Sequence, residues 1–200
     1  MKASLVILSF FATGLLLGLF HWFPAELLTY NISFYVLCAL MFSVGISIGN
    51  DPTSFRQFRH LNPRLIFLPL MTLVGTLLGV FAVSFFLKDR SVADCMAIGS
   101  GFGYYSLSSI LITQYKGIEL GTIALLSNIM REVITLLLAP WMVKYFGKLS
   151  PISAGGATTM DTTFPIIIRY SGKEFAIVSI YHGFIMDFSV PFLVTFFCSL

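Results

Sequence analysis

Charged residues are scarce in this chain: Lys, Arg, Asp and Glu make up only 10% of its 200 residues, against 57% hydrophobic residues. Soluble domains contain about 25% charged and about 45–50% apolar residues, so the composition excludes an ordinary soluble protein. A net charge of +3 is too small to indicate a nucleic-acid partner. With a mean hydropathy of +0.91, the composition predicts an all-α, polytopic membrane protein that lies almost entirely in the lipid bilayer.

The chain also lacks the residue patterns that bind metals and cofactors. Its three cysteines, at positions 38, 95 and 198, are widely spaced without metal-like pairing, and we interpret them as inert thiols in the membrane. There is no zinc-ligand spacing, nucleotide-binding loop or serine–histidine pair in the sequence. We therefore expect no catalytic residues, no metal and no cofactor, and an enzyme is the least favoured class.

What the chain has is long hydrophobic runs, close to the about 20 residues that a membrane helix needs. Seven segments cover approximately residues 4–23, 28–49, 65–87, 92–114, 119–146, 150–170 and 174–198. We divide them into two parts. Residues 1–90 contain the first three spans, and residues 91–200 form the predicted transport region.

Two of the segments are poor continuous helices. The fourth is interrupted by Gly99, Gly101 and Gly103, and the sixth by Gly155, Gly156 and Pro165. Irregular backbone at membrane depth is tolerated only where protein or a watery cavity covers it. We therefore expect both segments to be discontinuous or re-entrant, within part of an inverted-repeat transporter fold.

The 50–64 loop indicates the orientation. It contains Arg56, Arg59 and Arg64 against the single Asp51, and basic loops favour the cytoplasmic side. Alternation then places the N-terminus in the cytoplasm and the C-terminus outside. The orientation of the C-terminus would reverse if the sixth segment only dips into the membrane and returns.

Asp161 is the strongest candidate for a functional residue. It stands in the interrupted sixth segment among the hydroxyls of Thr158, Thr159 and Thr162. Membrane proteins keep such carboxylates mainly along ion or substrate pathways, and freed carbonyls beside them make a cation site. The alternative is that Asp161 caps a helix in a surface loop.

The fifth segment has a polar stripe on an otherwise apolar helix. Asn128, Arg131, Glu132 and Thr135 follow spacings of three and four. Arg131 and Glu132 point about 100° apart, so each needs its own partner, and we expect Arg131 to be the counter-ion of Asp161. The alternative is an ion-pair network that only fixes helix packing.

Further candidates lie in the fourth and last segments. The hydroxyls of four residues after the three glycines could line a pathway: Tyr104, Tyr105, Ser106 and Ser108. The alternative is glycine-mediated packing with interfacial tyrosines. His182 could approach the site or could be a buried, hydrogen-bonded structural residue. His182 and Asp187 are five residues apart, so they do not share a helical face and a proton relay between them is not expected.

Four ordered motifs resemble one family. They are Gly101-Phe102-Gly103-Tyr104-Tyr105-Ser106-Leu107-Ser108, Asn128-x-x-Arg131-Glu132 with Pro140, Gly156-Ala157-Thr158-Thr159-Met160-Asp161-x-Thr163-x-Pro165, and His182-Gly183-Phe184. Together they resemble the lysine exporter LysO family, a branch of the cation:proton antiporter and anion transporter superfamily. The resemblance spans most of the chain and is densest from about residue 99 to 192.

The resemblance implies export of L-lysine across the bacterial inner membrane by antiport with protons, and two inverted repeats with crossed discontinuous helices. Asp161 matches the acidic position of the family's Met-Asp motif. Two departures stand out: full-length members contain a further N-terminal portion of about three spans, and the position of Asp187 is apolar in relatives. We therefore predict a small membrane subunit of about three spans, a homo-oligomer, or both.

The sequence also suggests a mechanism. Ionised Asp161 pairs with an ammonium group of lysine, and the hydroxyls of Thr158, Thr159 and Ser106 replace the water that lysine loses. The break at 99–103 offers backbone N–H groups or a half-helix N-terminus to the α-carboxylate of lysine. Proton and lysine would then compete for one carboxylate. The alternatives are a sodium/proton antiporter or organic-anion carrier, and a membrane subunit that only scaffolds a partner.

Overall fold

The chain is described here by a computed structural model that covers residues 2–20, 46, 63–87 and 89–200. These residues are helical with no strand among them, which confirms the all-α class for this part of the chain. The predicted second span, 28–49, lies outside the described residues except for position 46, and so does most of the basic loop 50–64. The seven-span count and the orientation therefore stay predictions.

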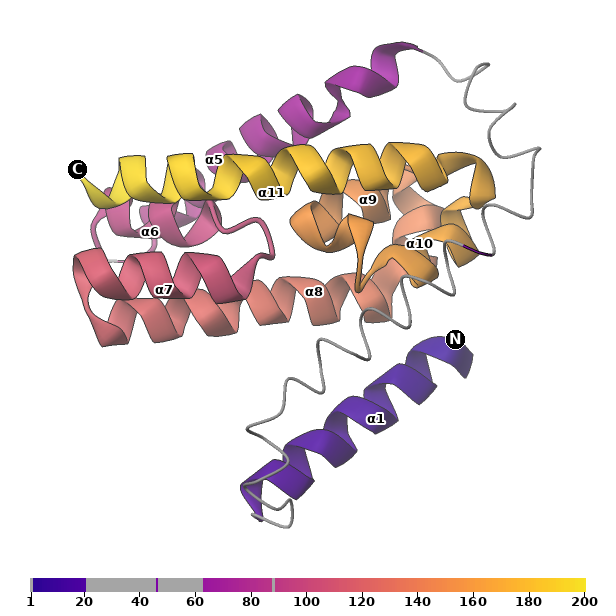
Figure 1. Ribbon diagram of the computed structural model, residues 1–200, viewed down its shortest axis with the longest axis horizontal. Coiled ribbons are helices and arrows are strands. Elements are labelled where there is room, and N and C mark those ends of the chain that lie inside the picture. The colour runs from indigo at the N-terminus through magenta and orange to yellow at the C-terminus, as the bar shows by residue number, and fades with distance from the viewer. Residues whose placement is uncertain (1, 21–45, 47–62, 88) are drawn as a thin grey trace.

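Three described helices are long and apolar enough to cross a membrane: Pro63–Ser84, Ile118–Phe146 and Lys173–Cys198. They contain α5 (Leu68–Ser84) after the 3-10 turn η1 (Pro63–Phe67), α8 (Ile118–Phe146), and α11 (Ala176–Cys198) after the turn η3 (Lys173–Phe175). Figure 1 shows α11 and α8 running along the long axis, with shorter helices between them. Helix α1 (Lys2–Leu19) lies outside this bundle and contacts α8.

The space between α8 and α11 is filled by two interrupted helical segments. The first is α6 (Val92–Gly99), a turn at residues 100–104, and α7 (Tyr105–Lys116). The second is α9 (Ser150–Gly155), the 3-10 turn η2 (Gly156–Met160), and α10 (Phe164–Ser171). The interruptions fall in the glycine-rich stretches, because the chain there leaves helical geometry: Phe102, Gly103 and Gly156 have positive φ.

Two hydrophobic cores hold these segments together. One, around Phe102, Ile112 and Met186, joins α6 and α7 to α8 and α11; the other, around Ile152, Ile167 and Val178, joins α9 and α10 to the same two helices. The outer surface is apolar as well: Phe184, Phe188, Phe192 and Phe196 are exposed at four-residue spacing along α11. A helix that exposes phenylalanine along one side is suited to contact lipid.

Candidate functional site

A cavity of about 220 Å³ lies where the two interruptions meet. We refer to it as the acidic cavity. Six of the predicted site residues line it, contributed by the start of α7, by α8, and by η2 with the turn that follows it: Tyr105, Ser106, Glu132, Thr158, Asp161 and Thr162. Residues that are far apart in the sequence are thus brought together at one place.

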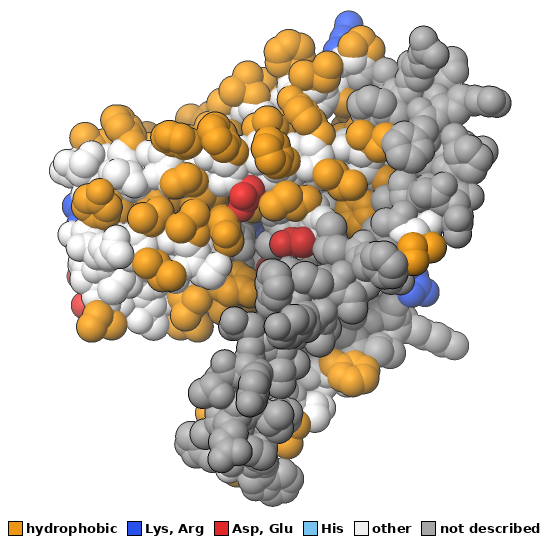
Figure 2. Space-filling view, viewed as in Figure 1, with side chains coloured by type: hydrophobic (Ala, Val, Ile, Leu, Met, Phe, Trp, Pro, Cys, Tyr) orange, Lys and Arg blue, Asp and Glu red, His pale blue; other side chains and the backbone are white. Residues whose placement is uncertain are grey.

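The charged residues that line the acidic cavity in the described part of the chain have one sign. Glu132, Asp161 and Asp187 all line it, and none of the described Lys, Arg or His residues does. Figure 2 shows acidic side chains in the middle of the face, with hydrophobic side chains beside them. Three carboxylates in a partly closed, low-dielectric space attract cations and disfavour anions.

Asp161 is the carboxylate at the second interruption itself. It stands between η2 and α10 and is half-buried. Its Oδ1 accepts hydrogen bonds from the backbone N–H of Thr162 at 2.5 Å and from the Thr162 hydroxyl at 3.3 Å. Its Oδ2 has no hydrogen-bond partner among the described residues. One carboxylate oxygen is therefore fixed by the local backbone, and the other is available to a ligand in the cavity.

The wall behind the acidic cavity is a contact between the two interruptions. The backbone N–H of Ala157 donates to the carbonyl of Phe102 at 2.9 Å. At Gly103 a Cβ atom would lie 3.1 Å from the carbonyl oxygen of Gly155, and at Gly156 it would overlap the carbonyl oxygen of Phe102. The close approach of the two backbones thus depends on glycine at these positions.

The predicted backbone donors for a carboxylate are already used. Each N–H from residue 101 to residue 105 donates a hydrogen bond: that of Gly103 to Asn128 Oδ1, two to carbonyls at the end of α6 and two to carbonyls within the turn. The prediction that the 99–103 break offers free N–H groups is therefore wrong in this conformation. Of the two sources that we expected, the half-helix N-terminus remains, since α7 begins at Tyr105 on the cavity wall.

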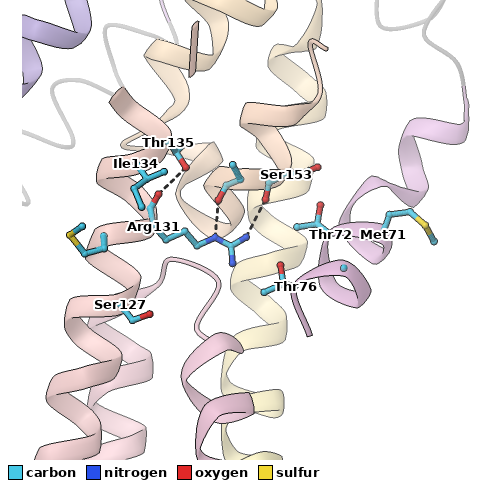
Figure 3. Close-up of a pocket in the computed structure, with 11 residues that line it drawn as sticks. Met71, Thr72, Thr76, Ser127, Arg131, Ile134, Thr135 and Ser153 are labelled. Carbon is cyan, nitrogen blue, oxygen red and sulfur yellow. Dashed lines mark hydrogen bonds between the residues drawn. The ribbon is translucent and has the colours of Figure 1, made fainter. Parts of the chain in front are cut away.

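Arg131 does not have the partner that we expected. Its Nε donates to the carbonyl of Ala154 at 2.8 Å and its Nη2 to that of Ser153 at 3.1 Å (Figure 3). The guanidinium lies 5.8 Å from the centre of the Phe102 ring. Within the part of the chain that the structure describes, it forms no ion pair with Asp161. The prediction of a counter-ion is wrong, because the C-terminal carbonyls of α9 compete for the positive charge.

Three other predicted residues lie behind the cavity wall. Thr159 and His182 are fully buried. The Nδ1 of His182 contacts the Thr159 hydroxyl at 3.3 Å, and its Nε2 contacts the Thr72 hydroxyl at 3.0 Å. Asn128 is also buried, and it contacts the backbone of the first interruption. His182 is thus a buried, hydrogen-bonded residue, which is the structural one of the two roles that the sequence left open. Together these residues hold the two interruptions in place.

Asn128 offers a test of this supporting role. Its Oδ1 accepts from Gly103 N–H at 2.7 Å, and its Nδ2 donates to the carbonyls of Ala124 at 2.9 Å and Ile98 at 3.3 Å. Asn128→Ala should lower the free energy of unfolding by about 1–3 kcal/mol, because a buried N–H loses its acceptor. Thermal unfolding in detergent measures this, with the exposed Ser127→Ala as control. Equal midpoints for the two variants would contradict the supporting role.

Two further residues line the acidic cavity. Tyr104, one of the residues whose hydroxyl we expect along a pathway, lines it just before α7, and Asp187, whose role the sequence leaves open, reaches it from α11. The signal for Asp187 was its charge within an apolar helix. As the spacing of five residues predicts, Asp187 and His182 do not share a helical face: His182 is fully buried, while Asp187 is half-buried at the cavity.

Comparison with known proteins gives a consistent result. The sequence pattern of the family described as "Lysine exporter LysO" matches residues 8–198. The chain is 34% identical over 163 residues to "Lysine exporter LysO" of Escherichia coli (strain K12), covering 82% of this chain and 54% of that protein. It is 32% identical over 195 residues to a Haemophilus influenzae protein named "Putative lysine exporter", covering 96% of this chain and 97% of that protein.

The chain therefore spans about half the length of the Escherichia coli relative and nearly the whole Haemophilus influenzae relative. No solved structure matches it.

Proposed function

This chain belongs to the lysine exporter LysO family, and we propose that it exports L-lysine across the bacterial inner membrane in exchange for protons. The family is one of transporters and not of enzymes. The single observation that supports the substrate is the acidic cavity of about 220 Å³, which is lined by Glu132, Asp161 and Asp187 and by no basic residue among those that the structure describes. Such a space suits a small molecule with ammonium groups.

The coupling follows from the position of Asp161. Its Oδ1 is held by Thr162, and its Oδ2 is free to pair with an ammonium group or to take up a proton. Because one carboxylate cannot do both at once, a proton that enters from outside displaces lysine, and release of the proton inside resets the site. External acid is therefore expected to accelerate export.

The proposed architecture is that of a transporter with discontinuous helices. The α6–α7 and α9–α10 segments would each cross or enter the membrane in two pieces, with the acidic cavity between them. We propose further that a small membrane subunit of about three spans, or another copy of the chain, supplies a second inverted unit. The N-terminus would be cytoplasmic and the C-terminus outside.

Counterflow in vesicles tests this function. The purified chain is reconstituted in vesicles loaded with unlabelled L-lysine, and uptake of labelled L-lysine is measured with and without a pH gradient. We expect the uptake of labelled L-lysine to exceed that of protein-free vesicles. We also expect it to be faster when a pH gradient drives the exchange of protons for lysine. Uptake of labelled sodium or of a dicarboxylate instead would identify a sodium/proton antiporter or an organic-anion carrier.

Two controls make the result decisive. Co-reconstitution with a candidate three-span subunit tests the partner: equal counterflow with and without it would contradict that part of the proposal. A scaffold function would give no counterflow in any combination, and Glu132→Gln would then change nothing in the partner's activity.

A further inference from the structure

A second and larger cavity, of about 740 Å³, lies between α5, α8 and α9. We refer to it as the Arg131 cavity (Figure 3). Arg131 lines it from α8, and five of the other lining residues carry hydroxyl groups: Thr72, Thr76, Ser127, Thr135 and Ser153. Among the described residues, no acidic side chain lines this cavity, and Arg131 is the one charged residue that does. In the described part of the chain its charge is thus opposite to that of the acidic cavity.

The guanidinium of Arg131 has more N–H donors than it has hydrogen bonds to the described residues. It presents five N–H groups in a planar fork, and two of them bind the carbonyls of Ala154 and Ser153. Within the described residues the other three have no hydrogen-bond acceptor. In a membrane protein unpaired donors of a charged group are costly, so an acceptor that enters the cavity is stabilised. The planar fork matches the two oxygens of a carboxylate.

The two cavities lie on opposite sides of the same contact. Arg131 and Glu132 are consecutive on α8, and they line different cavities. Between them lies the contact between the two interruptions, where the N–H of Ala157 donates to the Phe102 carbonyl. An amino acid with both ammonium and carboxylate groups is the solute whose charges match one cavity of each sign.

We propose that the Arg131 cavity binds the α-carboxylate of the amino-acid substrate. It is a binding site separate from the acidic cavity, which binds the ammonium group of the substrate. The two sites are occupied in succession, because a backbone contact separates them in this conformation. Arg131 is then the residue that distinguishes an amino acid from a simple diamine. This inference rests on the proposed lysine transport.

The test compares L-lysine with L-lysinamide, which keeps both amines and lacks the carboxylate. Both are measured as competitors of labelled L-lysine in counterflow, in mildly acidic buffer, and by thermal shift of the purified protein. The wild type should bind lysine about tenfold or more better than lysinamide, as expected for a charge-assisted hydrogen bond. In Arg131→Gln this ratio should fall to about one through weaker binding of lysine, with lysinamide unchanged.

Two further variants keep the outcome interpretable. Arg131→Lys retains the charge without the planar fork and should give an intermediate ratio, even if Arg131→Gln does not fold. Arg169→Gln removes an exposed positive charge of α10 away from both cavities and should keep the wild-type ratio. A parallel loss for lysine and lysinamide in the Arg131 variants, or an unchanged ratio, would overturn the proposal. Wild-type protein that neither binds nor transports lysine would overturn the proposed function instead.

Discussion

Replacing Asp161 with asparagine should reduce lysine counterflow to the level of protein-free vesicles while the protein stays folded. Asparagine keeps the shape of the side chain, and its Oδ1 can still accept from the backbone N–H of Thr162, as Asp161 Oδ1 does at 2.5 Å. The amide takes the place of Oδ2, which has no hydrogen-bond partner among the described residues. What is lost is the negative charge and the ability to bind a proton, and both are needed for exchange of lysine and protons.

The matched control is Asp94→Asn. Asp94 lies in the first turn of α6 and pairs with Lys116 at 3.6 Å, outside the acidic cavity. Counterflow of labelled lysine and elution on size-exclusion chromatography are measured for both variants. The Asp94 variant should transport lysine and elute as the wild type does. Substantial lysine counterflow by the Asp161 variant would refute the proposed mechanism.

Much of the fold could be predicted from the sequence because lipid imposes strict rules on it. Long apolar runs must form helices, since an apolar medium offers no partner for backbone groups, and α5, α8 and α11 follow the predicted segments closely. The interruptions could be located as well: Gly99–Gly103 and Gly155–Pro165 coincide with the ends of α6 and α9 and the starts of α7 and α10. The packing between elements could not be predicted, because it depends on distances along several helices at once.

The candidate site, like the fold, could be predicted from the sequence only in part. Asp161, Thr158 and Ser106 could be identified because polar groups in an apolar run are costly and therefore informative. The partner of Arg131 could not, because carbonyls at a helix end are present in every sequence and leave no residue signature. Likewise Asp187 could be noticed as a charge in α11 but not placed, since its distance from Asp161 depends on how α11 packs against η2.

Replacing Gly156 with alanine should be the most destructive change in the wall between the cavities. Its backbone, at φ 64° and ψ −125°, is one that only glycine adopts without strain, and forcing alanine into it costs about 1–3 kcal/mol. The added Cβ would also overlap the Phe102 carbonyl oxygen and lie 3.3 Å from Arg131 Nη2, for about 1–3 kcal/mol more. We expect a lower midpoint of thermal unfolding and loss of lysine counterflow.

Gly147→Ala separates the two causes. Gly147 ends α8 with φ 87°, so alanine there is also strained, but a Cβ at this position would meet no atom within 4 Å. This variant should lose only the backbone contribution and should keep transporting lysine. The difference between the two unfolding midpoints then measures the contact of the interruptions itself. Equal midpoints, or full counterflow by the Gly156 variant, would show that the close approach of Phe102 to Gly156 is not needed to hold either cavity.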